Sequence, residues 1–239
     1  MHLRIEKGLT KENSHLMTQD IIARCLTSLE HKPVNFQFSS TQKKIPANFE
    51  NAAVLVLIIG YRSGPKVVLT KRSESLPRHP GQISFPGGRV DEKDGDLEST
   101  ALRETYEEIG VSREKINILG RLPHYDVMTG FRVTPFVGWV ENQPLYRPDS
   151  GEVEEVIELP LAYILDPKNH KQHLKSIRGH DHNYFSISYQ DWYVWGATAG
   201  ILVNLYEALS TQNFDLNSSK TAWRSHRNLL FQQWLWFCY

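Results

Sequence analysis

The sequence predicts an α/β fold, because stretches typical of strands and of amphipathic helices follow one another without an internal repeat. Two stretches carry this prediction. Residues 52–59 are all apolar, as in a strand that is buried on both faces. Residues 97–109 place apolar side chains at helical spacing, and a loop rich in Pro and Gly precedes them. With 239 residues, the chain is long enough for one sizeable core with terminal extensions.

The predicted organisation begins with a helix at Thr18–Lys32, where apolar residues recur at helical spacing until Pro33. Residues 35–51 are polar and indicate a connecting arm. We therefore expect an N-terminal helix and arm at 1–51, a main domain at 52–210 and an aromatic C-terminal extension at 211–239.

The main domain is expected to open with a hairpin, in which turn-forming residues 60–65 separate strands at 52–59 and 66–70. Gly110 can end the helix at 97–109 through a left-handed cap. Further strands are predicted at 116–122, 133–140, 184–189 and 192–195, and a further helix at 197–209.

The composition excludes several classes of partner. Lys and Arg together number 27, as do Asp and Glu, so no overall field attracts nucleic acid or an anionic membrane. No apolar run approaches the roughly 20 residues needed to span a bilayer. Only Cys25 and Cys238 are present, which argues against a disulfide framework or a thiolate metal site. Together with an N-terminus that lacks the apolar stretch of a secretory signal, this predicts a cytoplasmic location.

Two groups of residues are assigned no chemistry. His180, Asp181 and His182 have no third metal ligand at a suitable spacing and are expected in a surface loop. The tail is unusually aromatic, with Trp234 and Trp236 among its residues. Core packing or a homodimer contact is the favoured interpretation of the tail, and adsorption to a membrane is the alternative.

The central helix carries the candidate chemistry. Leu97, Ala101, Glu104 and Glu108 follow one stripe, so an apolar line ends in two carboxylates, and Glu107 extends the acidic cluster outward. A hard divalent cation such as Mg²⁺ or Mn²⁺ would compensate these like charges, because it prefers carboxylate and water oxygens. The alternative is a solvated acidic face with Arg103 as a partner.

The stretch Gly88 to Val111 resembles the Nudix box, which runs Gly, five residues, Glu, seven residues, Arg-Glu, an apolar residue, any residue, Glu-Glu, any residue, Gly and an apolar residue. The resemblance implies the Nudix fold, an α/β/α sandwich around a mixed β-sheet, and a metal-dependent hydrolase. It makes Glu104, Glu107 and Glu108 the metal ligands. In two departures, Gly95 stands at the position of the first box Glu when counted back from Arg103, and Thr105 replaces an apolar residue.

The segment that precedes the box is similar to the signature of the coenzyme A diphosphatase branch. That signature runs Leu-Leu-Thr, one residue, Arg, Ser or Ala, three residues, Arg, three residues, Gly, three residues, Phe-Pro-Gly-Gly, and its spacing is kept here from Val68 to Gly88. Pro77 replaces the second signature Arg, and Arg78 follows it. A basic loop beside a metal site suits a substrate rich in phosphate. The predicted substrate-binding residues are Lys71, Arg72, Arg78, Phe85, Gly87 and Gly88.

Two later segments also resemble this branch: Glu152–Leu161, and Trp195 to Ala199 with the sequence Trp-Gly-Ala-Thr-Ala. In Nudix enzymes, a Glu from a loop beyond the box often joins the metal site or serves as the base. Glu152 and Glu155 are the candidates here, and exposed charges before a helix are the alternative interpretation. The predicted catalytic residues are Arg103, Glu107 and Glu152.

The resemblance leaves three hypotheses for the function. In the first, the enzyme cleaves coenzyme A or its derivatives to 3′,5′-ADP and 4′-phosphopantetheine with Mg²⁺ or Mn²⁺. In the second, the chemistry is the same but the substrate is ADP-ribose, NADH or another nucleoside diphosphate derivative. In the third, the chain is a non-catalytic module that senses nucleotides, although pure binding of an anion would not require an acidic cluster beside it.

Overall fold

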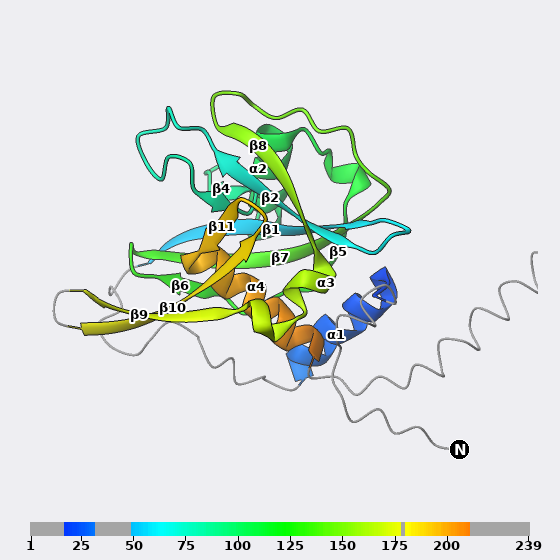
Figure 1. Ribbon diagram of the computed structural model, residues 1–239. Helices are drawn as coiled ribbons and strands as arrows, with labels where there is room; N and C mark the ends of the chain where they lie inside the picture. Colours follow the sequence, from blue (N-terminus) through cyan, green and yellow to red (C-terminus); the bar gives the residue numbers. More distant parts are fainter. Residues whose placement is uncertain (1–16, 32–48, 178–179, 211–239) are drawn as a thin grey trace, which may run out of the picture. The chain divides into compact units, whose positions relative to one another are not determined.

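Strand β1 (Glu50–Gly60) lies at the centre of the main sheet, as expected of a run whose residues are buried on both faces. The computed structural model describes residues 17–31, 49–177 and 180–210, which all fall within one unit of the chain, Leu9–Thr211 (Figure 1). Strand β1 pairs in parallel with β7 (Phe131–Glu141) and antiparallel with β2 (Lys66–Arg72). The sheet is therefore mixed.

Five further strands complete the main sheet. Strands β3 (Ile83–Ser84) and β8 (Val153–Pro160) pair with β2, β4 (Gly87–Arg89) pairs with β1, and β5 (Asn117–Arg121) and β6 (Tyr125–Val127) pair with β7. The pairing of β8 with β2 sets Val153 opposite Arg72, although the two residues are far apart in sequence. It therefore brings the acidic segment before β8 to the basic loop after β2.

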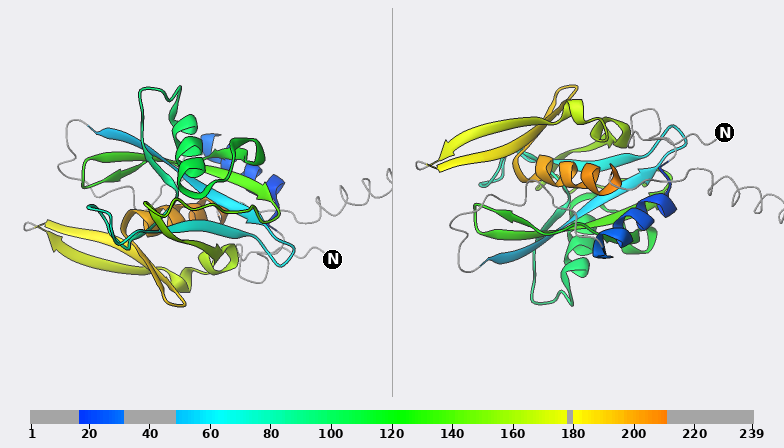
Figure 2. Two further views of the ribbon diagram at one scale, coloured as in Figure 1. Left: turned by 90° about the horizontal axis from the view of Figure 1, so that it is seen from above. Right: turned by 90° about the horizontal axis from the view of Figure 1, so that it is seen from below.

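Helices cover both faces of this sheet. Helix α2 (Leu97–Ile109) buries Leu102 and Ile109 against Leu55, Leu57 and Val68 on one face. Helix α4 (Gly196–Ser210) lies on the opposite face, as both views in Figure 2 show. Against α4 packs a second sheet, made of β9 (Lys171–Ile177), β10 (His180–Tyr189) and β11 (Trp192–Trp195).

The remaining helices are peripheral. Helix α1 (Gln19–His31) contacts β5 and α4, and its Leu26 packs beside Gly120. The short helices are η2 (Arg113–Lys115), α3 (Leu161–Ile164) and η3 (Pro167–Asn169). None of the helices in the described ranges is long and apolar enough to cross a membrane.

The predicted α/β/α sandwich around a mixed sheet is confirmed, and the predicted helices agree with α1, α2 and α4 to within one residue at each end. The prediction of a surface loop at His180 to His182 is wrong, because β10 already begins at His180 and pairs with β9. Strand β8 was missed, since the exposed Glu154 and Glu155 interrupt the alternation of buried Val153, Ile157 and Leu159. The predicted C-terminal extension at 211–239 lies outside the described residues.

Candidate active site

Helix α2 is held at both ends by groups that satisfy its free backbone atoms. Asp96 is the N-cap, and its carboxylate accepts a hydrogen bond of 2.7 Å from the Ser99 backbone N–H. Gly110 ends the helix in the left-handed conformation, at φ 72°, and its N–H donates to the Tyr106 carbonyl oxygen. With these ends fixed, α2 turns one face to the sheet, and its glutamates fall at the edge of that face.

The three glutamates of the box differ in exposure. Glu108 is buried, with 3% of its surface exposed, and the next residue, Ile109, belongs to the hydrophobic core. The side chain of Glu104 is 17% exposed and that of Glu107 is 55% exposed. Thr105 is buried too, and its hydroxyl donates to the Ala101 carbonyl oxygen at 2.7 Å, which satisfies the polar atom that replaces an apolar side chain.

The Gly-Gly pair before α2 forms strand β4 and allows the backbone to approach the helix. Gly87 has φ +151°, and a Cβ atom there would run into the Ala53 carbonyl oxygen. A Cβ atom at Gly88 would run into the Glu104 carboxylate. Both glycines were predicted to bind substrate, and the structure places them directly over the carboxylates of α2.

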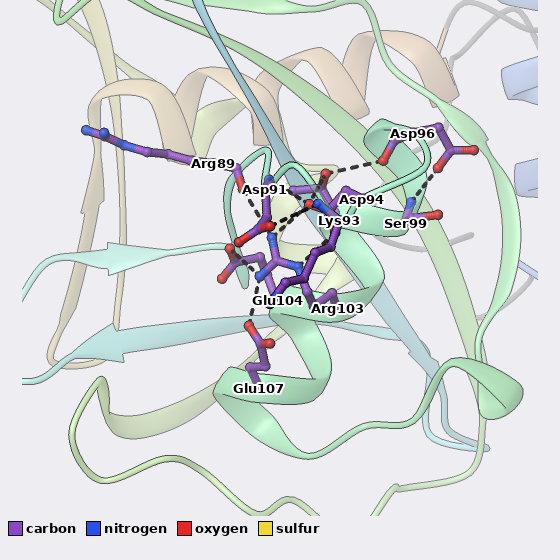
Figure 3. A network of polar contacts seen from close by, with 10 residues as sticks. Arg89, Asp91, Lys93, Asp94, Asp96, Ser99, Arg103, Glu104 and Glu107 are labelled. Atoms are coloured by element: carbon purple, nitrogen blue, oxygen red, sulfur yellow. Dashed lines mark hydrogen bonds and ion pairs between the residues drawn. The ribbon is translucent and has the colours of Figure 1, made fainter.

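Arg103 lies at the centre of a network of polar contacts, which Figure 3 shows from close by. Its Nε and Nη2 donate to the two oxygens of Asp94 at 2.8 and 2.9 Å. Its Nη1 donates to Glu104 at 3.0 Å and to Glu107 at 2.8 Å, and Nη2 also donates to the Arg89 carbonyl oxygen at 3.2 Å. All five N–H donors of the guanidinium are therefore engaged. Arg103 orients the acidic residues of α2 and ties them to β4.

Asp94 is the acidic residue that the box pattern lacked. Its side chain is only 4% exposed, and it also accepts hydrogen bonds from the Thr100 hydroxyl and the Asp91 N–H, at 2.8 and 2.9 Å. The hydrogen bonds from Arg103 hold the pKa of Asp94 well below its usual range. Counting back from Arg103 assigns the first box Glu to Gly95, whereas in three dimensions the neighbouring residue makes the ion pair.

Glu108 has the most perturbed environment of the three glutamates. Burial, followed by the charge of Glu104, raises its pKa to about 8, while the charge of Arg72 and a hydrogen bond from the Gly87 backbone act in the opposite direction. Its Oε2 atom is buried and has no hydrogen-bond partner in the part of the chain that the structure describes. Burial also raises the pKa of Glu104. Glu104 and Glu108 therefore have too little positive charge nearby to balance both carboxylates.

Glu152 reaches this pair from the segment before β8. Asp149 anchors that segment to the end of α2, because its N–H donates to the Glu108 carbonyl oxygen at 3.0 Å and its own carbonyl oxygen accepts from the Glu152 N–H at 3.0 Å. The Glu152 carbonyl oxygen in turn accepts from the Ser73 N–H at 2.8 Å. The charge of Glu152 contributes to the raised pKa values of both Glu104 and Glu108. Glu155 instead lies farther along β8, opposite Lys71.

Of the predicted phosphate-binding bases, Arg72 alone is found acting on the carboxylates in the described part of the chain. Its positive charge lowers the pKa of Glu108. Lys71 donates from Nζ to Glu154 at 2.8 Å, and Arg78 lies exposed in the loop after β2. Phe85 is buried, at 3% exposure, and therefore supports the loop from within the core.

The donor set fits a hard divalent cation, although the side chains are not arranged as a finished site. Within residues 17–31, 49–177 and 180–210, no three acidic, His or Cys side chains are grouped so as to hold a metal ion. Glu104 and Glu107 are turned towards Arg103, whereas Glu108 keeps one oxygen without a partner. A cation bound at Glu108 would supply the missing charge.

Comparison with known proteins identifies the family. The sequence model of the NUDIX domain matches residues 50–179. A protein of Enterobacter sp. (strain 638) named "Uncharacterized Nudix hydrolase NudL" is 42% identical over 158 residues, which cover 66% of this chain and 82% of that protein. A protein of the same name from Citrobacter koseri is 37% identical over 196 residues, covering 81% and 95%. The chain belongs to the Nudix family and is a Nudix hydrolase.

Solved structures with a similar arrangement include a Caenorhabditis elegans Ap4A hydrolase in a binary complex, with a TM-score of 0.41, 22% identity and coverage of 46% of this chain and 80% of that one. A MutT/nudix family protein from Enterococcus faecalis gives a TM-score of 0.41 and 17% identity, and the match covers 82% of this chain and 71% of that one.

Proposed function

We propose that this Nudix hydrolase cleaves the diphosphate of coenzyme A or its derivatives to 3′,5′-ADP and 4′-phosphopantetheine. The observation that carries the proposal is the buried carboxylate of Glu108, whose free oxygen lies beside Glu104, Arg72 and Glu152. The signature into which Arg72 falls, from Val68 to Gly88, supports coenzyme A as the substrate. The division of the chain into 1–51, 52–210 and 211–239 belongs to the same proposal.

In this proposal, Glu104, Glu107 and Glu108 hold Mg²⁺ or Mn²⁺. Such a cation, when bound, polarises a diphosphate and lowers the pKa of an attacking water. Glu107 needs to rotate away from Arg103 to reach it, which its exposed position allows. Arg103 acts as a positioning residue, because its bonds to Asp94 hold it in place beneath Glu104.

The chain's own side chains divide the remaining work. Arg72 binds a phosphate oxygen, because a guanidinium offers paired donors to phosphate. Glu152 accepts the proton of the attacking water, since it is the exposed carboxylate that faces Glu104 and Glu108 from a segment anchored to α2. As water bonds to one phosphorus, the bond from that phosphorus to the bridging oxygen breaks, and the second phosphate leaves with that oxygen.

The test is a panel of diphosphates incubated with the purified full chain and Mg²⁺ or Mn²⁺, with the products identified by mass. Coenzyme A should give 3′,5′-ADP and 4′-phosphopantetheine, with a kcat/KM above that for ADP-ribose and NADH. A preference for ADP-ribose or NADH would move the chain to another substrate class within the family. If no member of the panel were turned over, the nucleotide-sensing alternative would replace this proposal.

A further inference from the structure

One face of the second sheet is aromatic, basic and exposed. Tyr184 lies opposite His173, and Ser186 lies opposite both Lys171 and Trp195, so all these side chains project from the same face. The other face carries Phe185, Ile187 and Val194, which are buried on the side of α4. Packing against α4 therefore uses the second face, whereas on the first face Ser186 is buried, His173 and Tyr184 are partly exposed, and Lys171 and Trp195 are exposed.

Three rings form a row across all three strands of the exposed face. His173 and Tyr184 stack, with ring centroids 5.0 Å apart and planes at 22°. Trp195 meets the edge of Tyr184, with centroids 6.3 Å apart. We call His173, Tyr184 and Trp195 the aromatic row. Trp195 ends the row and is 44% exposed, so a large part of the indole surface can still be buried by a ligand.

Trp195 is fixed in position near the end of the basic loop that follows β2. Gly196 has φ +66°, which lets the chain turn from β11 directly into α4. In the first turn of α4, the Thr198 hydroxyl donates to the Ile83 carbonyl oxygen at 3.1 Å, and Ile83 is the residue of β3 that pairs with Lys71. Strand β11 also contacts β3. Because β3 pairs with β2, the end of the row lies next to the strand that adjoins β2.

This placement accounts for the Trp-Gly-Ala-Thr-Ala segment. The Gly provides the turn and the Thr attaches α4 to β3, so both residues have a structural task. The Trp meets the edge of Tyr184, but 44% of its surface is still exposed, so part of its ring is left for another contact. A ring that is held in one place and left exposed is suited to stacking on a ligand.

We propose that the aromatic row stacks on the adenine base of the substrate, with Lys171 paired to the phosphate on its ribose. The proposal rests on the proposed function, since it places the nucleotide half of the diphosphate on β9–β11. A base fits this face better than an acyl chain does, because the row includes an imidazole, and Lys171 and the Ser186 hydroxyl lie beside it. A planar base can stack there while its phosphate finds a positive charge.

The experiment measures binding of the two product halves separately, by calorimetry on the full chain. Trp195→Ala should weaken binding of 3′,5′-ADP by about tenfold or more, as expected for loss of a stacked base, and leave binding of 4′-phosphopantetheine unchanged. Trp195→Phe should keep most of the affinity. Tyr193→Ala is the matched control, because Tyr193 is an aromatic residue on the same strand and face, 49% exposed, outside the row.

The outcomes separate this proposal from the proposed function. Unchanged binding of 3′,5′-ADP to Trp195→Ala, or an equal loss with Tyr193→Ala, would overturn the stacking role. If Trp195→Ala did not fold, quenching of tryptophan fluorescence by 3′,5′-ADP would decide the matter, since Trp195→Phe should lose most of the quenching and equal quenching would overturn the proposal. A chain that binds 3′,5′-ADP through Trp195 yet hydrolyses no coenzyme A would contradict the proposed function alone.

Discussion

Glu158 and Glu108 lie on the same side of the main sheet, and they differ in how many hydrogen-bond donors surround a carboxylate that is largely removed from water. Glu158 in β8 accepts hydrogen bonds from the hydroxyls of Tyr61 and Tyr146, at 2.6 and 3.0 Å, and from Lys66 Nζ at 3.0 Å. Glu108 in α2 is more deeply buried and keeps one oxygen without a partner among the residues that the structure describes.

The pKa values of the two glutamates move in opposite directions. Burial raises the pKa of Glu158, but the hydrogen bonds from Tyr61, Lys66 and Tyr146 outweigh it, so the net shift is downward. At Glu108, burial is reinforced by the charge of Glu104, and the pKa rises to about 8. A carboxylate that is satisfied by its neighbours contributes to the fold, whereas one that the fold leaves short of donors is available to a ligand.

The largest expected effect comes from Glu108→Gln, which keeps the size of the side chain and removes its charge. The loss of several kcal/mol of metal-assisted stabilisation corresponds to a fall in kcat/KM of about a hundredfold or more. The variant should also require more Mg²⁺ or Mn²⁺. Steady-state assays over a range of metal concentrations measure both. Near-normal activity at low metal, together with a lower metal-free Tm, would make Glu108 a structural residue like Glu158.

The matched substitution Glu158→Gln should have the reverse profile. It weakens three hydrogen bonds to a charged acceptor, so we expect a loss of about 2–3 kcal/mol in the free energy of unfolding. Because Glu158 lies away from the box carboxylates, kcat and KM should change less than twofold at a temperature where the variant is folded. Urea denaturation and the same assay measure the two quantities. A large loss of kcat with unchanged stability would remove the contrast.

The comparison also shows how far the sequence could predict the site. The spacing of Glu104 and Glu108 along the helix was enough to place them at the edge of the core, because helical periodicity is local. The pairing of Asp94 with Arg103 was not predictable, since an inserted residue in a loop breaks the count of positions and only the folded loop shows which acid reaches the guanidinium.

The anchoring of Glu152 depends on pairing between distant strands. Its carbonyl oxygen meets the Ser73 N–H because β8 lies beside β2, and no strand was predicted at β8. The exposed Glu154 and Glu155 interrupt the alternation between Val153 and Ile157, at the point where the pairing with β2 shifts register. The distinction between Arg72 and Lys71 was equally out of reach, because the Lys71 partner, Glu154, also comes from β8.

Arg72→Ala tests which base of the loop serves the unsatisfied carboxylate and its substrate. Loss of a guanidinium that binds phosphate should raise KM for coenzyme A by about tenfold or more and lower kcat less. Lys71→Ala is the control, since that ammonium is held by Glu154 and should affect KM less. Michaelis constants for both variants decide the matter, and a larger effect from Lys71 would reverse the assignment.

Asp94→Asn probes the support beneath the box glutamates. The amide cannot accept both Arg103 donors as an anion does, so we expect a loss of about 1.5–3 kcal/mol in stability, in line with hydrogen bonds between charged groups. Activity should fall as well, because Arg103 would no longer hold Glu104 in place. Because the pKa of Asp94 is depressed in the fold, its contribution to stability is present above its unfolded pKa of about 4 and is lost as the pH falls below that value. Asp96→Asn, which retains a good N-cap, is the control.

The last expected effect is a dependence of metal-free stability on pH that originates at Glu108 and builds up over several pH units. Its pKa is raised from 4.5 to about 8, so the folded protein holds a proton that the unfolded chain releases. This contribution to stability is complete below about pH 4.5 and decreases as the pH rises towards 8, by about 1.4 kcal/mol per pH unit at most. In Glu108→Gln the contribution is absent.

The difference in Tm between the wild-type protein and this variant, measured in a chelator from pH 5 to 9, should therefore change steadily in favour of the variant up to about pH 8 and then level off. Glu158→Gln should show no such trend in that range, because the pKa of Glu158 is lowered, and a parallel trend in both variants would mean that burial alone does not distinguish the two carboxylates.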